Sequence, residues 1–419
     1  MPTGPLDPDL VSDLDALFEA LGGPIDPSTV ERIGRSGDAR VAWLLSDLLR
    51  FLAEGELEHT VRNAWQELTG QRITEPLAWG PTTDLLIAWD LPAPPAYVSW
   101  KRRLFELIEP GWAPFFDDVQ ATIDWRLVSW GGVRIDDRPL DSVASGCPDG
   151  CIPALDDPAV TDAQGGDWYP DDAVVFGLEV DGAAMAFPKN IMEVHEMVNL
   201  TLGGRRIALP YCTLCGSAQA YLTDRVADGV ALDGAEVYEL RTSGLLSRSN
   251  KVMFELHTRS VFDTFTGVAV TGPLREAGVQ LEQLTVVTST WGEWKRAHPG
   301  TVIIAEDGGI GRSYPSDPLR GRDDDGPIFP VGDVDQRLSV QEPVVGVVLS
   351  DGTALAFPAA RAAAVLALGG EVGLAGVVLD DAAGGLTALD EATGEPITSH
   401  RAFWFAWSQF HPETMVWLG

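Results

Sequence analysis

The hydrophobic positions near the start of the chain recur with the period of a helix. Leu10, Leu14, Leu17, Phe18 and Leu21 lie on one face of an about 3.6-residue repeat, and two glycines end the run. Similar apolar faces recur at residues 41–52, 61–68 and 97–108. Short amphipathic helices in series are typical of helical repeat stacks, and residues 31–40 resemble a turn between two HEAT helices. We therefore expect residues 1–120 to form a HEAT-like α-helical stack that binds a protein partner.

From residue 173 the pattern changes to short apolar runs rich in β-branched side chains. Gly, Asp-Gly and Thr-Gly turns separate these runs, which is typical of strands. The runs lie at residues 174–176, 252–254, 286–287, 302–304 and 344–349. The stretch from Asp136 to Asp172 holds ten aspartates and one basic residue, Arg138. We expect residues 121–172 to form an acidic, loop-rich connector between the two regions.

The β region contains an internal repeat. Residues 177–188 match residues 346–358, and residues 291–301 match residues 404–414. Such self-similarity predicts related structural modules. The expected fold class is therefore multidomain α and β, with a helical stack followed by two related, internally duplicated β modules. The first module covers residues 173–340, and the second, shortened module covers residues 341–419.

Charge narrows the range of partners. The 419 residues carry 62 acidic and 29 basic side chains, for a formal net charge of −33. Nucleic acids and anionic membrane surfaces bind clustered Lys and Arg, so this balance argues against both as partners. No apolar run approaches the ~18 residues of a membrane helix. The first residues lack the basic start and apolar stretch of a signal peptide, so we expect a cytoplasmic protein.

The repeat separates structural residues from candidates for chemistry. Both copies contain a Trp-x-x-Trp segment followed by His-Pro, so His298 and His411 are most simply core or capping residues. Only the first copy contains His195 and the pair Cys212-x-x-Cys215. We therefore expect the function to reside in the first module.

The cysteine pair has the spacing of a metal or redox site. Two thiolates at positions i and i+3 of a tight turn reach one metal ion, and Gly216 permits that turn. His195, on a short helix that begins after Pro188, would complete two thiolates and one imidazole with an open coordination position. This donor set suits one transition metal ion, with copper favoured over zinc or iron. Position 199 is Asn, so this is not the H-E-x-x-H zinc motif.

Two other interpretations of the cysteines stay open. All four cysteines, including Cys147 and Cys151, would make a structural zinc site. A disulfide between Cys147 and Cys151 would be unusual in a reducing cytoplasm. Alternatively, Cys212 and Cys215 form a metal-free redox dithiol, although strands rather than a helix are expected on both sides of the pair.

Several sequence words together resemble one family. They are Val194-His-Glu-Met-Val-Asn199, Tyr211-Cys-Thr-Leu-Cys-Gly216, Ser249-Asn-Lys-Val-Met253 and Trp291-Gly-Glu-Trp294. They resemble the prokaryotic domain-of-unknown-function family numbered 3179 over residues ~125–419. The chain departs from the usual words of that family at Val194, Leu200 and Thr213. The resemblance implies a fold and a shared site of Cys212, Cys215 and His195, and it implies no reaction.

The leading hypothesis is a metal-dependent enzyme with oxidative copper or iron chemistry on a small molecule or thiol. Its expected metal ligands are Cys212, Cys215 and His195. The nearest candidates for catalytic proton or hydrogen-bond partners are Tyr211, Glu196 and Asn199. A polar stretch in the same module supplies the candidate substrate-binding residues Arg241, Ser243 and Asn250. The alternatives are a structural zinc protein whose helical stack binds a protein partner, and a metal-free thiol–disulfide oxidoreductase.

Overall fold

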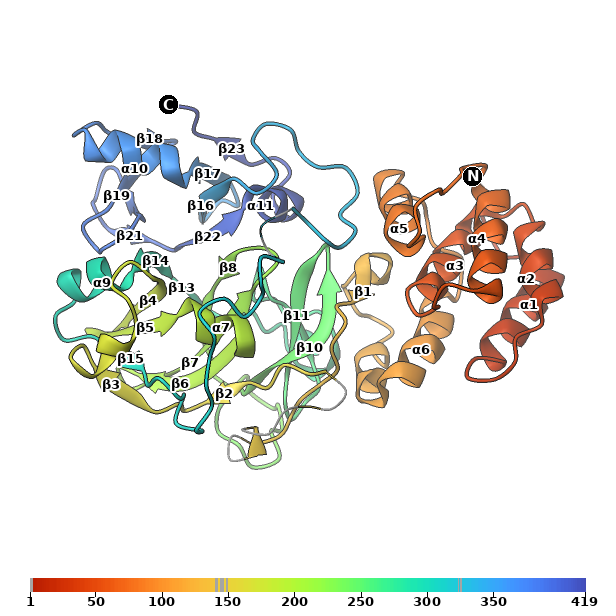
Figure 1. Cartoon of the computed structure of the whole chain (residues 1–419), viewed down its shortest axis with the longest axis horizontal. Helices are drawn as coiled ribbons and strands as arrows, with labels where there is room; N and C mark the ends of the chain where they lie inside the picture. The colour runs from red at the N-terminus through yellow and green to blue at the C-terminus, as the bar shows by residue number, and fades with distance from the viewer. Residues whose placement is uncertain (1–2, 140–141, 144–146, 148–149, 323, 325) are drawn as a thin grey trace. The chain divides into compact units, whose positions relative to one another are not determined.

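The computed structural model describes residues 3–139, 142–143, 147, 150–322, 324 and 326–419, and the chain divides into two compact units (Figure 1). The first unit contains residues 1–131 with the short segments 246–248 and 329–333. The second unit contains residues 132–245, 249–328 and 334–419.

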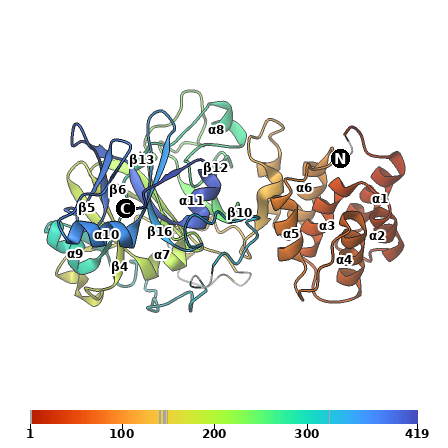
Figure 2. The same ribbon diagram turned by 90° about the horizontal axis from the view of Figure 1, so that it is seen from above.

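The first unit is helical, as the apolar periodicity predicted (Figure 1, Figure 2). Four of the five residues predicted on the apolar face of the first helix are its buried residues, namely Leu10, Leu14, Leu17 and Phe18. The fifth, Leu21, lies beyond the end of the helix at Glu19. Two further helices, α2 and α5, fall outside the predicted faces because one is short and the other begins with Trp-Gly-Pro. The helices are α1 (Pro8–Glu19), α2 (Pro27–Gly34), α3 (Ala42–Leu49), α4 (Glu56–Thr69), α5 (Trp79–Ala88) and α6 (Tyr97–Ile108), followed by the 3-10 helix η2 (Pro110–Phe116).

A buried ion pair fixes two of these helices. Lys101 of α6 is fully buried, and its Nζ donates to Asp47 Oδ1 on α3 at 2.9 Å. The same Nζ donates to the Val128 carbonyl at 2.6 Å, where strand β1 (Val128–Trp130) begins. Burial lowers the pKa of Lys101, although the Asp47 carboxylate opposes this shift. The pair thus ties α3, α6 and β1 together inside the first unit.

The β region consists of five small sheets in a propeller-like arrangement. The predicted runs at 174–176, 252–254 and 302–304 fall in strands. The runs at 344–349 and 286–287 do so except for Leu349 and Val286. Three sheets have the strand orders β1-β10-β11-β12, β13-β9-β7-β6-β2 and β14-β4-β5-β15-β3, and β8 pairs with β7. Their remaining strands are β2 (Leu155–Asp156), β3 (Val160–Asp162), β4 (Val174–Val180), β5 (Ala183–Pro188), β6 (Met197–Leu202), β7 (Arg205–Cys212), β8 (Ser217–Ala218), β9 (Ala220–Leu222), β10 (Leu240–Ser247), β11 (Asn250–Glu255), β12 (Val261–Asp263), β13 (Gln283–Leu284), β14 (Val287–Thr290) and β15 (Val302–Ile304).

The other two sheets belong to the C-terminal part of the chain. Their strand orders are β22-β16-β17-β23 and β18-β19-β20-β21. The strands are β16 (Pro343–Val348), β17 (Ala354–Pro358), β18 (Gly373–Leu374), β19 (Val377–Asp380), β20 (Thr387–Asp390), β21 (Pro396–Ile397), β22 (Ser399–Phe403) and β23 (Met415–Val416). The helices of the β region are α7 (Lys189–His195), α8 (Gly272–Glu276), α9 (Trp291–Ala297), α10 (Ala359–Ala367) and α11 (Trp404–Phe410).

Two sheets repeat the same topology, as the repeated sequence words predicted. In β14-β4-β5-β15 and in β22-β16-β17-β23, the first two pairings are antiparallel and the last is parallel. In the first copy Trp294 packs on Gly177 and its Nε1 donates to Thr301 Oγ1 at 2.9 Å. In the second copy Trp407 packs on Gly346 and its Nε1 donates to Thr414 Oγ1 at 3.0 Å.

The repeated histidines have the structural role that the repeat indicated. His298 and His411 are the C-caps of α9 and α11. Their rings pack on Trp294 and Trp407, with centroid distances of 3.9 and 4.3 Å. Because both copies of the repeat contain this histidine, it does not mark a site that is unique to the first module.

A Gly177→Ala substitution is expected to destabilise the second unit by about 1–3 kcal/mol. A β-carbon at position 177 would overlap the buried Trp294 ring, and the ring is held by its hydrogen bond to Thr301. Urea denaturation measures the loss. Gly80→Ala is the matched control, because a β-carbon there meets no atom within 4 Å. Equal stability of the two variants would contradict this packing.

The connector contributes strands to the β region. Strand β2 pairs with β6, and β3 pairs with β15. Cys147 and Cys151 are joined by a disulfide, a bond that the sequence led us to regard as unusual. Two of the ten aspartates of this stretch, Asp141 and Asp149, lie outside the described residues. In the part of the chain that the structure describes, no helix is both long and apolar enough to cross a membrane.

Candidate functional site

The cysteine pair lies on a tight turn between two strands, as the flanking residues predicted. Cys212 ends β7 and pairs with Ser217, the first residue of β8. Gly216 has a positive φ of 57°, and a β-carbon there would lie 2.9 Å from the Phe403 ring. Because only glycine adopts this conformation without strain or overlap, Gly216 is required for the turn. The Cys215 carbonyl accepts the Phe403 backbone N–H at 2.8 Å, which fixes the turn against β22.

The two thiols are buried and unequal. Cys212 is 2% exposed and Cys215 is fully buried. The Cys215 thiol lies within hydrogen-bond reach of the Cys212 sulfur and, at 3.3 Å, of the Ser249 carbonyl. The backbone N–H groups of Lys251 and Cys215 also point at the Cys212 sulfur. Burial raises the pKa of Cys212, but these hydrogen bonds outweigh it and hold that pKa below its usual value.

The pKa of the second thiol moves in the opposite direction. Burial raises the pKa of Cys215 well above its usual range, and the neighbouring Cys212 and Glu196 charges raise it further. Of the two thiols, Cys212 is therefore the one that loses its proton more readily, and Cys215 stays protonated. This is the asymmetry that a nucleophilic and a resolving cysteine require.

A buried ion pair lies beside the thiols. Glu196 follows α7 in a left-handed conformation, with φ of 50°. One of its carboxylate oxygens accepts from Thr213 Oγ1 at 3.1 Å, and the other lies 3.4 Å from Lys251 Nζ. Lys251 Nζ also donates to the Glu196 carbonyl at 2.5 Å and to Thr242 Oγ1 at 2.8 Å. Burial lowers the pKa of Lys251, while the charges of Glu196 and Cys212 oppose that shift.

Several buried polar atoms around this turn have no hydrogen-bond partner among the described residues. They belong to Ser217, which pairs with Cys212, and to Ser249 and Asn250. The segment that contains the last two contacts the thiols through the Ser249 carbonyl and the Lys251 backbone N–H. Asn250 is 1% exposed, and neither its Oδ1 nor its Nδ2 has a partner. An unsatisfied buried polar group costs about 1–3 kcal/mol, so such a cluster is expected where a polar molecule binds.

His195 does not join the cysteines. Its Nδ1 lies 2.8 Å from the Pro153 carbonyl, and its Nε2 lies 2.7 Å from Tyr314 Oη. Because a carbonyl only accepts, Nδ1 carries the proton, and the Tyr314 hydroxyl donates to Nε2. Within the described ranges, no group of three His, Cys, Asp or Glu side chains is placed to hold a metal ion. The structure therefore brings the two thiols together without the imidazole.

The stability of the protein is expected to fall between pH 6.5 and pH 4 through His195. Burial lowers its pKa to about 4, the Pro153 carbonyl raises it, and of the nearby charges Arg312 lowers it and Asp136 raises it. Between pH 4 and pH 6.5 the unfolded chain therefore binds a proton at His195 that the folded chain does not bind. The contribution of neutral His195 to the free energy of unfolding is complete above pH 6.5. It is lost as pH falls towards 4, by about 3 kcal/mol.

Urea denaturation over this pH range of wild type and His195→Gln measures the effect. The variant is expected to lose this part of the pH dependence, whereas the exposed control His59→Gln keeps it. Identical pH profiles for wild type and His195→Gln would contradict the assignment.

Three of the predicted site residues form a separate structural cluster. Asn199 Nδ2 donates to Asp156 Oδ1 at 2.8 Å, and its amide oxygen accepts the Leu240 backbone N–H. Arg241 binds the same carboxylate at 2.6 Å. Ser243 donates to the Val252 carbonyl. These contacts fasten β2, β6, β10 and β11 together, and none of them reaches the thiols.

Of the other predicted residues, two lie at the cysteine turn. Glu196 and Asn250 flank it, as described above. Tyr211 directly precedes Cys212, but its ring packs in the core on Phe176, with centroids 4.7 Å apart.

Lys251 and Thr213 are the site residues that the sequence analysis missed. Lys251 is one of four lysines in the chain and stands in an apolar strand, next to Val252, Met253 and Phe254. A lone lysine in such a strand is a signal that it has a buried partner. Thr213 carries no comparable signal, because its contact with Glu196 depends on the fold of the turn.

Comparison with known proteins gives one match. Residues 149–393 match the model of a family described as "Protein of unknown function (DUF3179)". No curated protein and no solved structure matches the chain. The match covers the cysteine turn, Glu196, Lys251 and His195, so the site lies within the part that the family shares.

Proposed function

We propose that this chain, which belongs to the DUF3179 family, is a thiol–disulfide redox protein whose reacting groups are Cys212 and Cys215. The observation that carries the proposal is the asymmetric pair of thiols. Cys212 receives two backbone N–H groups and the Cys215 hydrogen bond, whereas Cys215 is held protonated beside the Ser249 carbonyl. The ion pair of Lys251 and Glu196 lies beside the two thiols.

The reaction consists of two exchanges with a low-molecular-weight disulfide. The Cys212 thiolate attacks one sulfur, which breaks the disulfide, forms a mixed disulfide on Cys212 and releases one small thiolate. The Cys215 sulfur then attacks Cys212, and its proton goes to the second departing thiolate. The products are a Cys212–Cys215 disulfide, one small thiolate and one small thiol, so two electrons pass from the protein to the substrate.

The burial of the two sulfurs limits the size of the substrate. Both sulfurs lie beneath the surface, and only Leu214 and Gly216 of the turn are partly exposed. A folded protein partner does not reach a sulfur that is 2% exposed, whereas a small disulfide needs only a local opening at Leu214. The neighbouring polar atoms of Ser217 and Asn250 are available to bind its polar groups.

The metal-dependent hypothesis does not fit the residues that lie together. A copper, iron or zinc site of three ligands requires His195, and both ring nitrogens of His195 bind other groups. A four-thiolate zinc site requires Cys147 and Cys151, which are bonded to each other. No step of the mechanism is therefore assigned to a metal. The HEAT-like helical stack and its protein partner stay predictions.

Thiol counting and elemental analysis of the untagged protein test the proposal. We expect two alkylatable thiols per chain after mild reduction, both lost on treatment with oxidised glutathione, and a Cys212–Cys215 disulfide in the peptide mass spectrum. About one copper, zinc or iron per chain that is absent from Cys212→Ser would overturn the proposal. If His195→Ala also lost that metal, the three-ligand site of the sequence hypothesis would replace it.

A further inference from the structure

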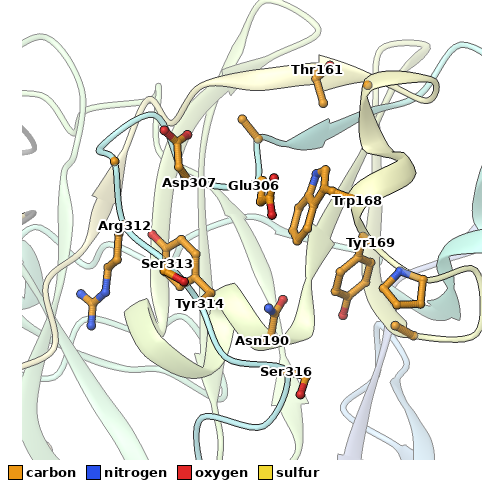
Figure 3. Close-up of a pocket in the computed structure, with 15 residues that line it drawn as sticks. Thr161, Trp168, Tyr169, Asn190, Glu306, Asp307, Arg312, Ser313, Tyr314 and Ser316 are labelled. Carbon is orange, nitrogen blue, oxygen red and sulfur yellow. The ribbon is translucent and has the colours of Figure 1, made fainter.

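A second feature of the β region is an open cavity of about 930 Å³ at the start of α7. Trp168 and Tyr169 lie on one side of it and Tyr314 on the other, with Asn190 between them (Figure 3). The Tyr169 hydroxyl donates to the Val174 carbonyl at 2.6 Å and accepts backbone N–H groups from the start of α7. These bonds fix the aromatic wall next to Asn190.

Two residues that line this cavity each carry a buried polar atom without a partner among the described residues. The first is the Trp168 Nε1–H donor and the second is the Asn190 Oδ1 acceptor. Asn190 is only 6% exposed, and its Nδ2 already donates to the Pro315 carbonyl at 3.3 Å. A donor and an acceptor beside one cavity are both satisfied by a ligand whose groups accept and donate hydrogen bonds.

Tyr314 presents a third polar atom of fixed character. Its hydroxyl hydrogen is directed at His195 Nε2, 2.7 Å away, because His195 Nδ1 binds the Pro153 carbonyl. Because its hydrogen is used in this way, the phenolic oxygen offers any further polar group an acceptor only. Glu306 and Asp307 add two carboxylates to the lining (Figure 3). Arg312 adds one positive charge, and its guanidinium carbon lies 5.8 Å from the centroid of the Tyr314 ring.

We propose that this cavity binds an uncharged, hydroxyl-rich ligand, a mono- or oligosaccharide. A sugar hydroxyl both donates and accepts, so it satisfies Trp168 Nε1 and Asn190 Oδ1 with one kind of group. The apolar face of a sugar ring packs on the aromatic rings of Trp168 or Tyr314. The two carboxylates accept further hydroxyl groups. Together with Arg312 they leave the charged side chains of the lining with one net negative charge, which disfavours an anionic ligand such as a phosphate.

An organic cation is the ligand that would compete best with a sugar. Aromatic rings and carboxylates also attract an ammonium group. A quaternary ammonium, however, carries no acceptor for the Trp168 indole N–H. A saccharide therefore matches the polar atoms of Trp168, Asn190 and Tyr314 better than a cation does. Binding of a cation is one of the outcomes that the test distinguishes.

Saturation-transfer NMR with D-glucose, D-galactose, D-mannose, N-acetylglucosamine and maltose tests the proposal on the full chain, with tetramethylammonium as the competing probe. We expect transfer to at least one saccharide and none to tetramethylammonium. Calorimetry of the bound saccharide is expected to show an about tenfold loss of affinity in Trp168→Phe, which keeps an aromatic ring but removes the N–H. Asn190→Ala is expected to cause a similar loss.

The control is Trp89→Phe, the same substitution at an exposed tryptophan of the helical unit, which is expected to bind as wild type does. Circular dichroism melting of each variant separates lost binding from lost folding, and Trp168→Phe decides the test if Asn190→Ala does not fold. The proposal is overturned if no saccharide of the panel binds, if tetramethylammonium binds instead, or if Trp168→Phe binds saccharide as tightly as wild type. Neither probe reacts with thiols, so the result is independent of the proposed redox function.

Discussion

A Cys215→Ser variant is expected to stop the reaction with oxidised glutathione at a mixed disulfide on Cys212. The Cys212 thiolate still has two backbone N–H groups to stabilise it, so the first exchange proceeds. The second exchange requires the sulfur of residue 215, and a serine hydroxyl does not attack a disulfide. Intact mass spectrometry would show one added glutathione per chain. Cys212→Ser, which lacks the nucleophile, is expected to add none.

The control for both variants is Cys147→Ser combined with Cys151→Ser. These residues form their own disulfide and lie outside the proposed reaction, so this variant is expected to react as wild type does. The order of the two steps is wrong if glutathione attaches to Cys215 in Cys212→Ser and leaves Cys212 unmodified in Cys215→Ser.

A Lys251→Met variant is expected to lose about 3–5 kcal/mol of stability and to raise the pKa of Cys212. Lys251 is 3% exposed, and its ammonium lies 3.4 Å from the buried Glu196 carboxylate. Without the ammonium, that carboxylate remains buried without its opposite charge, and it faces the Cys212 thiolate alone. Urea denaturation measures the first effect, and the pH dependence of Cys212 alkylation measures the second.

Two further variants make the Lys251 result specific. Lys295→Met removes an ion pair with Asp171, whose side chain is 72% exposed, and is expected to cost less than about 1 kcal/mol. Lys251→Met combined with Glu196→Gln removes both charges of the ion pair and is expected to recover part of the stability. A Lys251→Met protein as stable as Lys295→Met would show that the ion pair does not support the cysteine turn.

The elements that depend on local pattern could be predicted from the sequence. The apolar face of α1, the strand at Val174–Val180 and the short helix before Glu196 all follow from periodicity and turn residues. The repeat was equally visible, because Gly177 with Trp294 and Gly346 with Trp407 recur in matching words. Each of these features is encoded within one stretch of chain or in two similar stretches.

The partners of His195 could not be predicted in this way. Pro153 is 42 residues before it and Tyr314 is 119 residues after it, and no local pattern links them. His195 and the two cysteines occur in the same module of the sequence, and this was the reason to expect them in one site. Glu196 and His195 are adjacent, yet Glu196 contacts Thr213 beside the thiols, and His195 contacts Tyr314 at the cavity.

The redox equilibrium of the cysteine pair tests the central claim most directly. The protein is equilibrated in glutathione buffers of graded potential, alkylated, and the Cys212–Cys215 peptide is quantified by mass spectrometry. The account predicts a single two-electron transition in which both thiols disappear together as the disulfide forms. Thiols that stay reduced at every potential, or a transition that involves only one of them, would contradict it.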